Sequence, residues 1–353
     1  MSRINLKVLY GEDIPNTKIK SNFSNNAQFK SLKHKSSSIY FLNFLFIWHH
    51  GLLRSLINYK PDLIIAEGES NILSYLKAYI YKIFFKETKL IHWSYGGLPQ
   101  TRKKSFFKKF LKKNFLKIFN GFIVYSNYGK KVLLKSYNVE EDKIFVALNI
   151  SQVDKLIELK KHTKIDKKFI NIAKEKFTLI TSGSIEKEKN FQLILDALSM
   201  LDNENYNLII LGDGPFKENL KIIVDRKKLS NVYFIGKVPW EEIFHYYDIA
   251  DLFILPGRGG MVISECMACG LPVLLKAADG IERDLVIDKQ TGFYFQENNP
   301  DSLAKEIFKI SQNKSLLDKV SKNAYNLIRD NHGIKKFAES FELAILKTMG
   351  EDN

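Results

Sequence analysis

The sequence predicts an α/β protein built from two Rossmann-like domains, each with a doubly wound, mostly parallel sheet. Apolar runs of strand length alternate with segments of helical period. Several runs are apolar on both faces, which is typical of parallel strands covered by helices. The 353 residues are enough for two domains of ordinary size. The expected strands cover residues 6–10, 62–66, 89–93, 121–125, 177–183, 206–212, 232–236 and 251–256.

The two series of strands are separated by a polar, lysine-rich stretch over residues 160–176. After it a new series of strands and helices begins at Phe177. We therefore expect a first domain over 1–165 and a second over 166–334. A ligand of such a protein is expected in the crevice at the carboxyl ends of the strands, between the domains.

Charge is divided unevenly along the chain. The formal net charge is +15, but residues 1–150 hold 25 basic and 9 acidic residues, whereas residues 151–353 hold 29 basic and 30 acidic ones. This distribution disfavours a uniformly basic protein that coats nucleic acid. It indicates that the first half meets an anionic partner.

Several features bear on the compartment. Two cysteines cannot form a disulfide framework, and the first ten residues lack the apolar core of a signal peptide. The longest apolar stretch, over residues 40–48, contains Asn43 and is too short to span a bilayer. We expect a cytoplasmic protein that can associate with a membrane surface.

The densest basic segment, residues 101–120, alternates lysine pairs with Phe and Leu pairs. One interpretation is a helix whose Phe face packs on the sheet beneath a solvated lysine face. A second is a helix that lies in an anionic membrane interface, with its Phe residues dipping in. Nucleic acid is a third, which no recognisable motif accompanies. The membrane-facing candidates are Lys108, Lys109, Lys112 and Lys113.

Anion-binding features gather in the second half. The strand over 177–183 ends at Gly183, and Ser184 follows it. Lys189 lies where the next helix starts. The strand over 251–256 leads into the loop Gly257-Arg258-Gly259-Gly260 and then a helix. Free backbone N–H groups at a helix start, an ammonium and a guanidinium all favour phosphate. Because these loops leave the same edge of one sheet, together they are stronger evidence than a lone glycine-rich turn.

Other polar residues allow two interpretations each. Glu265 lies on the helix after the glycines, either as a solvated residue or as an acceptor for sugar hydroxyls. Glu67 and Glu69 follow the strand over 62–66 and either contact acceptor hydroxyls or cap the next helix. Gly96, beside Tyr95, suggests a loop that faces the cleft. Cys266 and Cys269 are expected to pack in the core, since no second Cys or His pair accompanies them.

The order of the motifs in the second half resembles a known family. The segments SGSIEKEKN (182–190), LGDGP (211–215), SECMACGLPVLL (264–275) and GIERDLVIDKQTGFYF (280–295) occur in the order and spacing of family 4 glycosyltransferases. The resemblance covers about residues 177–345, and residues 121–149 resemble the last part of the family's first domain. It implies a GT-B fold, in which two Rossmann-like domains face each other across a cleft. It also implies that the last residues, 335–353, form a helix that crosses back to the first domain.

The resemblance assigns roles to individual residues. Lys189 matches the lysine that holds the donor diphosphate, and Glu265 matches the second glutamate of an E-x7-E motif, which meets the ribose. Three positions depart from the pattern. The first glutamate falls at Gly257, the arginine that partners the lysine falls at Ser184, and the histidine of the first domain has no clear match, with Tyr95 or Ser94 closer to its slot than His92. Arg258 is a candidate for the missing positive charge. The loop and helix amides that match the diphosphate and sugar contacts are those of Gly259, Gly260, Met261 and Val262.

The resemblance further implies a retaining transfer from a nucleotide-activated sugar without a bound metal or cofactor, and the sequence has no DxD motif. The catalytic candidates are Lys189, Arg258 and Glu265, and Gly183 and Ser184 complete the donor site. The expected acceptor is a lipid-linked or other glycan in surface polysaccharide assembly (O-antigen, capsule or exopolysaccharide), at the inner face of the cell membrane.

Two alternative functions remain. One is a non-catalytic GT-B subunit that binds a membrane or a partner enzyme, which the departures at Gly257 and Ser184 suggest. The other is a GT-B sugar-nucleotide epimerase.

Overall fold

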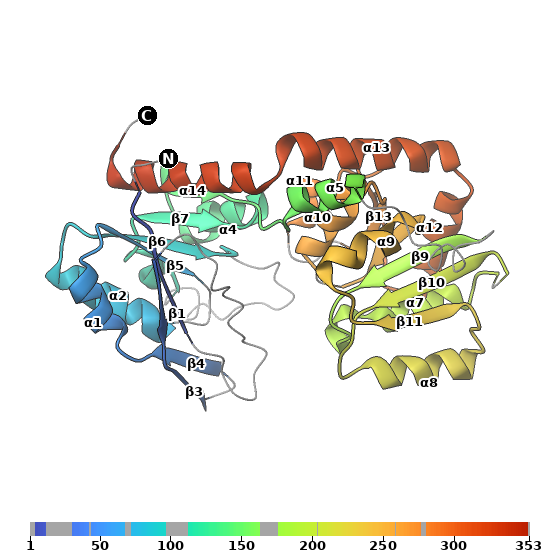
Figure 1. The fold of residues 1–353 in the computed structure, drawn as a ribbon, viewed down its shortest axis with the longest axis horizontal. Helices are drawn as coiled ribbons and strands as arrows, with labels where there is room; N and C mark the ends of the chain where they lie inside the picture. The colour runs from blue at the N-terminus through green and yellow to red at the C-terminus, as the bar shows by residue number, and fades with distance from the viewer. Residues whose placement is uncertain are drawn as a thin grey trace. The chain divides into compact units, whose positions relative to one another are not determined.

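A computed structural model of the chain divides into two compact units (Figure 1). The first unit contains Met1–Tyr125, Gly129–Val146 and Phe341–Asn353, and the second contains Ser126–Tyr128 and Ala147–Ser340. The sequence-based boundary near residue 165 stays a prediction; by contacts, residues 147–165 group with the second unit. The structure describes residues 4–11, 30–41, 44–67, 72–96, 112–162, 176–202, 204–257, 259–276 and 280–351.

The first unit is organised around a four-stranded parallel sheet. Its strands follow one another in chain order: β5 (Leu63–Glu67), β6 (Lys89–Ser94), β7 (Gly121–Val124) and β8 (Ile144–Val146). The first three lie where the sequence predicts strands. The sheet therefore brings the ends of β5, β6 and β7 to one edge.

Two smaller pairs of strands precede this sheet. Strand β1 (Lys7–Gly11) pairs in parallel with β2 (Lys30–His34), and β3 (Ser36–Phe41) pairs in antiparallel with β4 (Phe44–His49). The apolar stretch over 40–48 therefore contributes to a pair of strands that the sequence did not predict.

Helices α1 (Leu52–Tyr59), α2 (Ile72–Phe84) and α4 (Asn127–Tyr137) and the short 3₁₀ helix η1 (Glu141–Lys143) complete the first unit. The core contains Tyr75 of α2, Leu90 of β6, Phe122 of β7 and Leu133 of α4, together with Phe119. Apolar side chains of α2 and α4 are thus buried with those of the sheet, which is the main source of stability for such an arrangement.

The second unit has a six-stranded, fully parallel sheet in the order β11-β10-β9-β12-β13-β14. The chain starts in the middle of this sheet, builds outward to one side, and then returns to build the other side, which is the strand order of a Rossmann fold. The strands are β9 (Phe177–Ser182), β10 (Tyr206–Leu211), β11 (Val232–Gly236), β12 (Leu252–Leu255), β13 (Val273–Leu275) and β14 (Phe293–Tyr294).

Helices cover both faces of this sheet. Leu208 of β10 and Leu252 of β12 belong to one core cluster with residues of α7 (Phe191–Leu198), α8 (Lys217–Lys227) and α12 (Pro300–Ser311). On the opposite face, Phe253 of β12 packs edge-on against Tyr247 of α9 (Ile243–Asp248) at 6.3 Å between ring centroids. The remaining helices are η2 (Lys187–Lys189), η3 (Trp240–Glu242), α5 (Val153–His162), α10 (Met261–Ala268), α11 (Glu282–Leu285), α13 (Lys314–Asn331) and α14 (Ile334–Met349).

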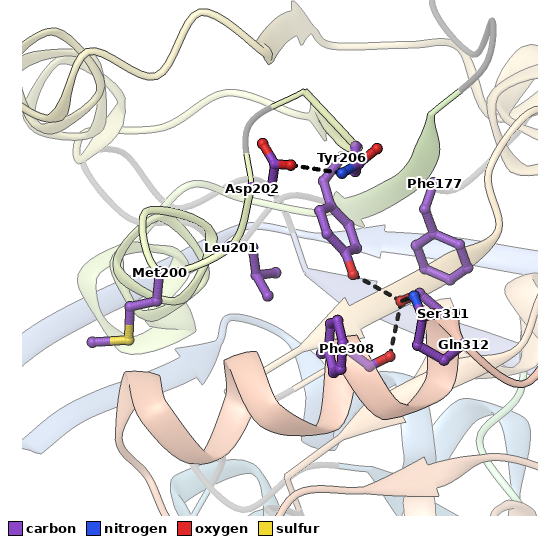
Figure 2. Close-up of a pocket in the computed structure, with 9 residues that line it drawn as sticks. Phe177, Met200, Leu201, Asp202, Tyr206, Phe308, Ser311 and Gln312 are labelled. Atoms are coloured by element: carbon purple, nitrogen blue, oxygen red, sulfur yellow. Dashed lines mark hydrogen bonds between the residues drawn. The ribbon is translucent and has the colours of Figure 1, made fainter.

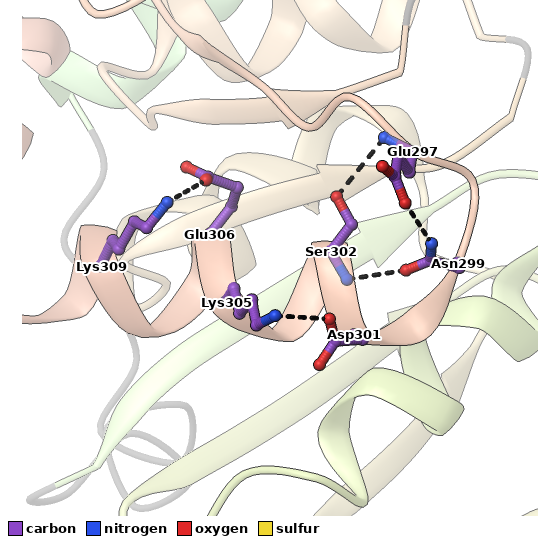
Figure 3. A network of polar contacts seen from close by, with 7 residues as sticks. All are labelled: Glu297, Asn299, Asp301, Ser302, Lys305, Glu306 and Lys309. Carbon is purple, nitrogen blue, oxygen red and sulfur yellow. Dashed lines mark hydrogen bonds and ion pairs between the residues drawn. The ribbon is translucent and has the colours of Figure 1, made fainter.

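The start of α12 shows how local sequence fixes a helix end (Figure 3). Asn299 is the N-cap, and its Oδ1 accepts a hydrogen bond from the backbone N–H of Ser302 over 2.8 Å. Pro300 follows in the first turn, where a missing N–H costs nothing. Asp301 then pairs with Lys305, one turn later, at 2.7 Å.

The last helix, α14, begins in the second unit and ends in the first. Phe341 packs edge-on against Trp93 of β6 at 4.8 Å between ring centroids, and a Cβ on Gly121 of β7 would lie 2.5 Å from Thr348 Oγ1. The second half of α14 therefore packs closely on the sheet of the first unit. Among the described residues, no helix combines the length and apolar character needed to cross a membrane.

Candidate active site

Strands β9 and β12 are neighbours in the sheet of the second unit, yet the chain leaves them toward opposite sides. Leu179 pairs with Leu252 and Ile180 with Phe253. Ligands of open α/β sheets bind at such a point, outside the carboxyl ends of the strands. The loops that follow these two strands are the ones in which the sequence predicts phosphate contacts.

The two loops approach each other closely at Gly257. A Cβ built on Gly257 would lie 2.7 Å from the carbonyl oxygen of Lys189 and 2.8 Å from that of Glu188. Contacts below 3.0 Å are not found for real Cβ atoms. The glycine at this position therefore permits a backbone approach that a glutamate could not make without displacing the neighbouring loop.

Lys189 lies beside two of the predicted glycines. Its Nζ is 3.3 Å from the position of a Cβ on Gly259 and 3.9 Å from that of a Cβ on Gly183. Asn190, the next residue, adopts the left-handed conformation (φ 56°) and serves as the N-cap of α7. The ammonium group is thus brought to the glycine loop that precedes α10.

The loop after β10 supports the loop after β9. A Cβ on Gly212 (φ 123°) would lie 1.9 Å from the carbonyl oxygen of Gly183, so only glycine fits. The backbone N–H of Ile185 donates to Asp213 over 3.0 Å, and that of Phe216 donates to Ile185 over 3.0 Å. These contacts fix the backbone from which Lys189 projects.

Helix α10 starts directly after the glycines, with Gly260 as its N-cap. The first-turn N–H groups of a helix, here those of Met261 and Val262, have no partner within the helix and carry partial positive charge. Met261 is exposed. The predicted amides therefore lie at a helix start, next to the loop that approaches Lys189.

Glu265 occupies the second turn of α10 and is only 8% exposed. Its Oε1 accepts a hydrogen bond from Ser151 Oγ over 2.6 Å and another from Trp240 Nε1 over 2.9 Å. The interpretation of Glu265 as a solvated surface residue is therefore wrong. Ser151 and Trp240 are residues of this cluster that the sequence analysis did not identify.

The structure describes Ser184 and Gly257, two positions that depart from the family pattern, but not Arg258, the candidate for the missing positive charge. Ser184 is exposed, and its Oγ donates to Glu186 Oε1 over 2.6 Å. Gly257 makes the close approach described above. Arg258 lies outside the described residues.

The two cysteines behave as core residues. Cys266 and Cys269 are buried free thiols, and burial raises the pKa of Cys269 to about 12. A thiol with a raised pKa is a poor nucleophile and metal ligand at neutral pH. Within the described residues, no group of three or more His, Cys, Asp or Glu side chains is arranged to hold a metal ion.

A cavity of about 430 Å³ lies elsewhere on the second unit (Figure 2). Phe177 and Tyr206, which begin β9 and β10, line one side, and Phe308 and Ser311 of α12 line the other. Tyr206 Oη and Ser311 Oγ are hydrogen-bonded at 2.7 Å. Because these residues lie at the amino ends of the strands, the cavity is separate from the loops around Lys189.

In the first unit, two acceptor-side candidates, Glu67 and Tyr95, lie with Tyr125 at the carboxyl ends of neighbouring strands. Glu67 ends β5, and its Oε1 accepts a hydrogen bond from Tyr125 Oη over 3.1 Å. Tyr95 follows β6 and packs edge-on against Tyr125 at 4.8 Å between ring centroids. Burial, and then the charge of Glu67, raises the pKa of Tyr125, which keeps its phenol protonated as a donor. Tyr125 was missed by the sequence analysis, and Glu69 lies outside the described residues.

Gly96 makes a structural contact in the same region. It has φ 68°, and a Cβ there would lie 2.7 Å from the carbonyl oxygen of Gly129. Nearby His92 is buried among aromatic rings, with Phe119 at 4.8 Å and Tyr75 at 5.3 Å between centroids. Burial, and then Lys112, lowers the pKa of His92 to about 3. His92 is thus a neutral core histidine.

The basic segment is described only from residue 112. Residues 112–116 are helical, and Phe115 packs edge-on against Tyr75 at 5.6 Å between ring centroids. Lys112 Nζ lies 5.4 Å from the centroid of Tyr137, and Lys113 is exposed. At its described end the segment therefore follows the packing interpretation for Phe115. Lys108 and Lys109 lie outside the described residues.

The second unit also matches a known family. Residues 162–327 match the family model described as Glycosyl transferases group 1. The C-terminal region of the chain is a glycosyl transferases group 1 domain. The finer resemblance to family 4 stays a prediction.

Curated relatives are named as enzymes that transfer or attach sugars. An uncharacterized glycosyltransferase of Methanocaldococcus jannaschii is 26% identical over 80% of this chain and 75% of its own length. The alpha-monoglucosyldiacylglycerol synthase of Acholeplasma laidlawii is 27% identical over 64% of this chain and 58% of its own length. The lipopolysaccharide 1,2-N-acetylglucosaminetransferase of Salmonella typhimurium is 30% identical over 49% of each chain. The chain thus spans between about half and three quarters of the length of these relatives.

A solved structure shares the fold of most of the chain. Anabaena Alr3699/HepE, crystallised in complex with UDP, has a TM-score of 0.70 and 16% identity over 90% of this chain and 86% of that chain. The predicted GT-B fold, with two Rossmann-like domains, is confirmed. Separately from the fold, the family match and the relatives named as glycosyltransferases identify the chain as a glycosyltransferase.

Proposed function

We propose that the protein transfers a sugar, with retention of configuration, from a nucleoside-diphosphate sugar to a lipid-linked or other glycan acceptor. The observation that carries the proposal is the position of the Lys189 ammonium beside Gly183 and Gly259, next to the start of α10. An ammonium group and helix-terminal N–H groups at a switch point of the sheet form a site suited to a diphosphate.

The chemistry of the leaving group gives these residues their proposed role. When the bond between the sugar carbon and the diphosphate oxygen breaks, negative charge develops on the diphosphate and the sugar becomes cation-like. Preorganised positive charge at the leaving group is the largest contribution that such a site can make. We assign this role to Lys189 and the α10 N-terminus, with Arg258 as a further cation.

We propose that Glu265 binds the donor rather than attacking it. It is held by two hydrogen-bond donors of the protein, and it matches the ribose-contacting position of the family. In this scheme the acceptor oxygen attacks the sugar from the face that the diphosphate leaves. The acceptor proton passes to the departing phosphate oxygen, so no enzyme nucleophile is required.

The similar proteins suggest which donor and which acceptor to test first. UDP is the first nucleotide to test, because the similar Anabaena structure contains it. Surface polysaccharide or glycolipid synthesis is the proposed setting, because two relatives are named for lipopolysaccharide and for a glucosylated diacylglycerol. We propose Glu67, Tyr95 and Gly96 for the acceptor side, and residues 101–120 for attachment to the inner face of the cell membrane.

A two-step assay tests the proposal. UDP-, GDP- and ADP-sugars are first screened for thermal stabilisation of the purified protein, and the best donor is then incubated with and without glycolipid acceptors. Transfer of the sugar with the anomeric configuration of the donor retained supports the proposal. Turnover of the donor to an epimer without acceptor would indicate an epimerase, and no nucleotide binding at all would indicate a non-catalytic subunit.

A further inference from the structure

The carboxylate of Glu265 is held by the protein through one of its two oxygens. Ser151 Oγ and Trp240 Nε1 both donate to Oε1. Within the described residues, Oε2 accepts no hydrogen bond. An ionised carboxylate can accept about four hydrogen bonds, so Oε2 keeps its capacity for another donor.

Each of the two donors is itself held in place. The backbone N–H of Ser151 donates to Ser264 Oγ over 3.1 Å, and Ser264 Oγ donates to the carbonyl of Met261 over 2.7 Å. Ser151 is therefore tied to the first turn of α10, the same turn that carries the proposed phosphate-binding amides.

Trp240 is held from a different direction. It begins η3, after β11, and Lys155 Nζ of α5 lies 5.5 Å from the centroid of its ring. The same ammonium lies 3.6 Å from Glu241 Oε1. The ammonium over the indole face, itself paired with Glu241, and the hydrogen bond from Nε1 to Glu265 together hold the ring of Trp240.

The donor and acceptor roles of Trp240 and Glu265 are fixed by their chemistry. An indole N–H can only donate, and an ionised carboxylate can only accept. Two donors from separate segments therefore fix both the rotamer of Glu265 and which oxygen faces away from them. A side chain that is already ordered loses less conformational entropy when a ligand binds to it.

We propose that Ser151 and Trp240 are positioning residues of the donor site, which hold Glu265 Oε1 so that Oε2 receives a hydroxyl group of the nucleotide's ribose. This inference rests on the proposed function. Neither residue needs to touch the donor, and both act through the carboxylate. Lys155 contributes indirectly, by holding the ring of Trp240.

A double-mutant cycle separates this role from simple packing. Trp240→Phe removes the N–H but keeps an aromatic ring beneath Lys155. Nucleotide affinity is measured by calorimetry, using whichever of UDP, GDP and ADP binds the wild type most tightly. We expect about tenfold weaker binding, the effect of losing one hydrogen bond to a charged group. In a Glu265→Ala background the same change should alter affinity less than about twofold, because the carboxylate through which it acts is gone.

Ser151 offers an independent test with a conservative rescue. Ser151→Ala should weaken nucleotide binding, whereas Ser151→Thr, which keeps the hydroxyl, should bind within about threefold of the wild type. Trp48→Phe makes the same chemical change in β4 of the first unit, which does not contain Glu265, and should bind like the wild type. Thermal unfolding of each variant identifies any that fails to fold.

The outcomes separate failure of the positioning role from failure of the proposed function. If the wild type binds none of the three nucleotides, the proposed function is refuted and the positioning role falls with it. If the wild type binds but Trp240→Phe binds equally well, only the positioning role is refuted. It is also refuted if Trp240→Phe weakens binding as much in the Glu265→Ala background, since the effect is then one of packing.

Discussion

Alanine at Gly257 tests the geometry of the two loops directly, because the added carbon meets only backbone atoms. The Cβ would lie 2.7 Å from the Lys189 oxygen, 2.8 Å from the Glu188 oxygen and 2.9 Å from the Lys189 carbonyl carbon. None of these atoms can rotate away as a side chain would. The loop that carries Lys189 must therefore shift, or the start of the glycine loop must.

The expected cost follows from this crowding. Overpacking of a well-packed site by one methyl group lowers the free energy of unfolding by about 1–3 kcal/mol. Because backbone obstructs the added carbon, we expect a loss of about 2 kcal/mol for Gly257→Ala. For a domain of this size, that corresponds to a fall in unfolding temperature of about 4–8 °C. Nucleotide affinity should fall as well, because the displaced loop carries the Lys189 ammonium.

Scanning calorimetry and titration with a nucleoside diphosphate measure the two effects. Gly350→Ala is the control for nucleotide affinity, since it lies just beyond α14, outside the proposed donor site, and nothing lies within 4 Å of a Cβ there. Its φ of 81° makes alanine costly in stability without crowding, so a loss of stability alone should not lower affinity. Gly350→Ala should leave nucleotide affinity unchanged. Gly257→Glu should be no better than Gly257→Ala, although it restores the family's glutamate. A Gly257→Ala protein with wild-type stability and affinity would refute the close approach of the loops.

Four further predictions concern the proposed site and membrane attachment. Lys189→Ala should weaken nucleotide-sugar binding in calorimetry by roughly 1.5–3 kcal/mol, the scale of a hydrogen bond to a charged group. Glu265→Gln should lower kcat/KM in a transfer assay without accumulating a covalent sugar adduct, because Glu265 binds the donor and does not attack it. Addition of a metal chelator should leave the transfer rate unchanged, since positive side chains and helix amides carry the leaving-group charge. The protein should sediment with anionic vesicles at low salt, because each lysine near such a surface contributes about 1 kcal/mol to binding. Replacing Lys108, Lys109, Lys112 and Lys113 with Gln should abolish this sedimentation.

Each of these has an outcome that contradicts it. Unchanged affinity in Lys189→Ala would remove the lysine from the donor site, and a glycosyl adduct on Glu265 in the wild type would make it a nucleophile. Loss of transfer on chelation, with recovery when a divalent ion is added back, would assign charge neutralisation to a metal. Equal sedimentation with neutral vesicles would show that the lysines are only a solvated face of the first unit.

The strands of the second unit could be predicted because local and global signals agree there. Strand β12 is a continuous apolar run between Asp251 and Pro256, and β9 and β10 are largely apolar runs that each end before a glycine. Burial on both faces makes such runs conspicuous. The pair β3 and β4 lacks this agreement. Its residues fall partly in the apolar stretch over 40–48, which has neither strict alternation nor Gly and Pro at its ends.

Site residues that belong to a single recognisable loop could also be predicted from the sequence. Lys189, Gly259 and Gly260 each follow a predicted strand, and parallel strands bring their ends to one edge. Ser151 and Trp240 are different, because their importance comes from contact with Glu265, which lies 114 and 25 residues away along the chain. The exit of β11 was visible in the sequence, but nothing local shows which way the indole N–H points.

Tyr125 illustrates the same limit in the first unit. It ends the predicted strand over 121–125, and Glu67 directly follows the predicted strand over 62–66, so the same reasoning could have selected it. It was passed over because a tyrosine at a strand end is ordinary. Only its hydrogen bond to Glu67 and its contact with Tyr95 mark it.

The glycine at position 257 is better understood as one part of a connected set than as an isolated loss. Gly212 lets the loop after β10 press against Gly183, and Gly257 lets the loop after β12 press against Lys189. A side chain at either position would displace the backbone that presents the ammonium group. At the position where the family 4 pattern predicts a glutamate, the glycine allows this backbone approach. Recognition of the sugar hydroxyls then falls to residues other than 257, and Glu265, with Oε2 still available, is the buried carboxylate of this site best placed to take part in it.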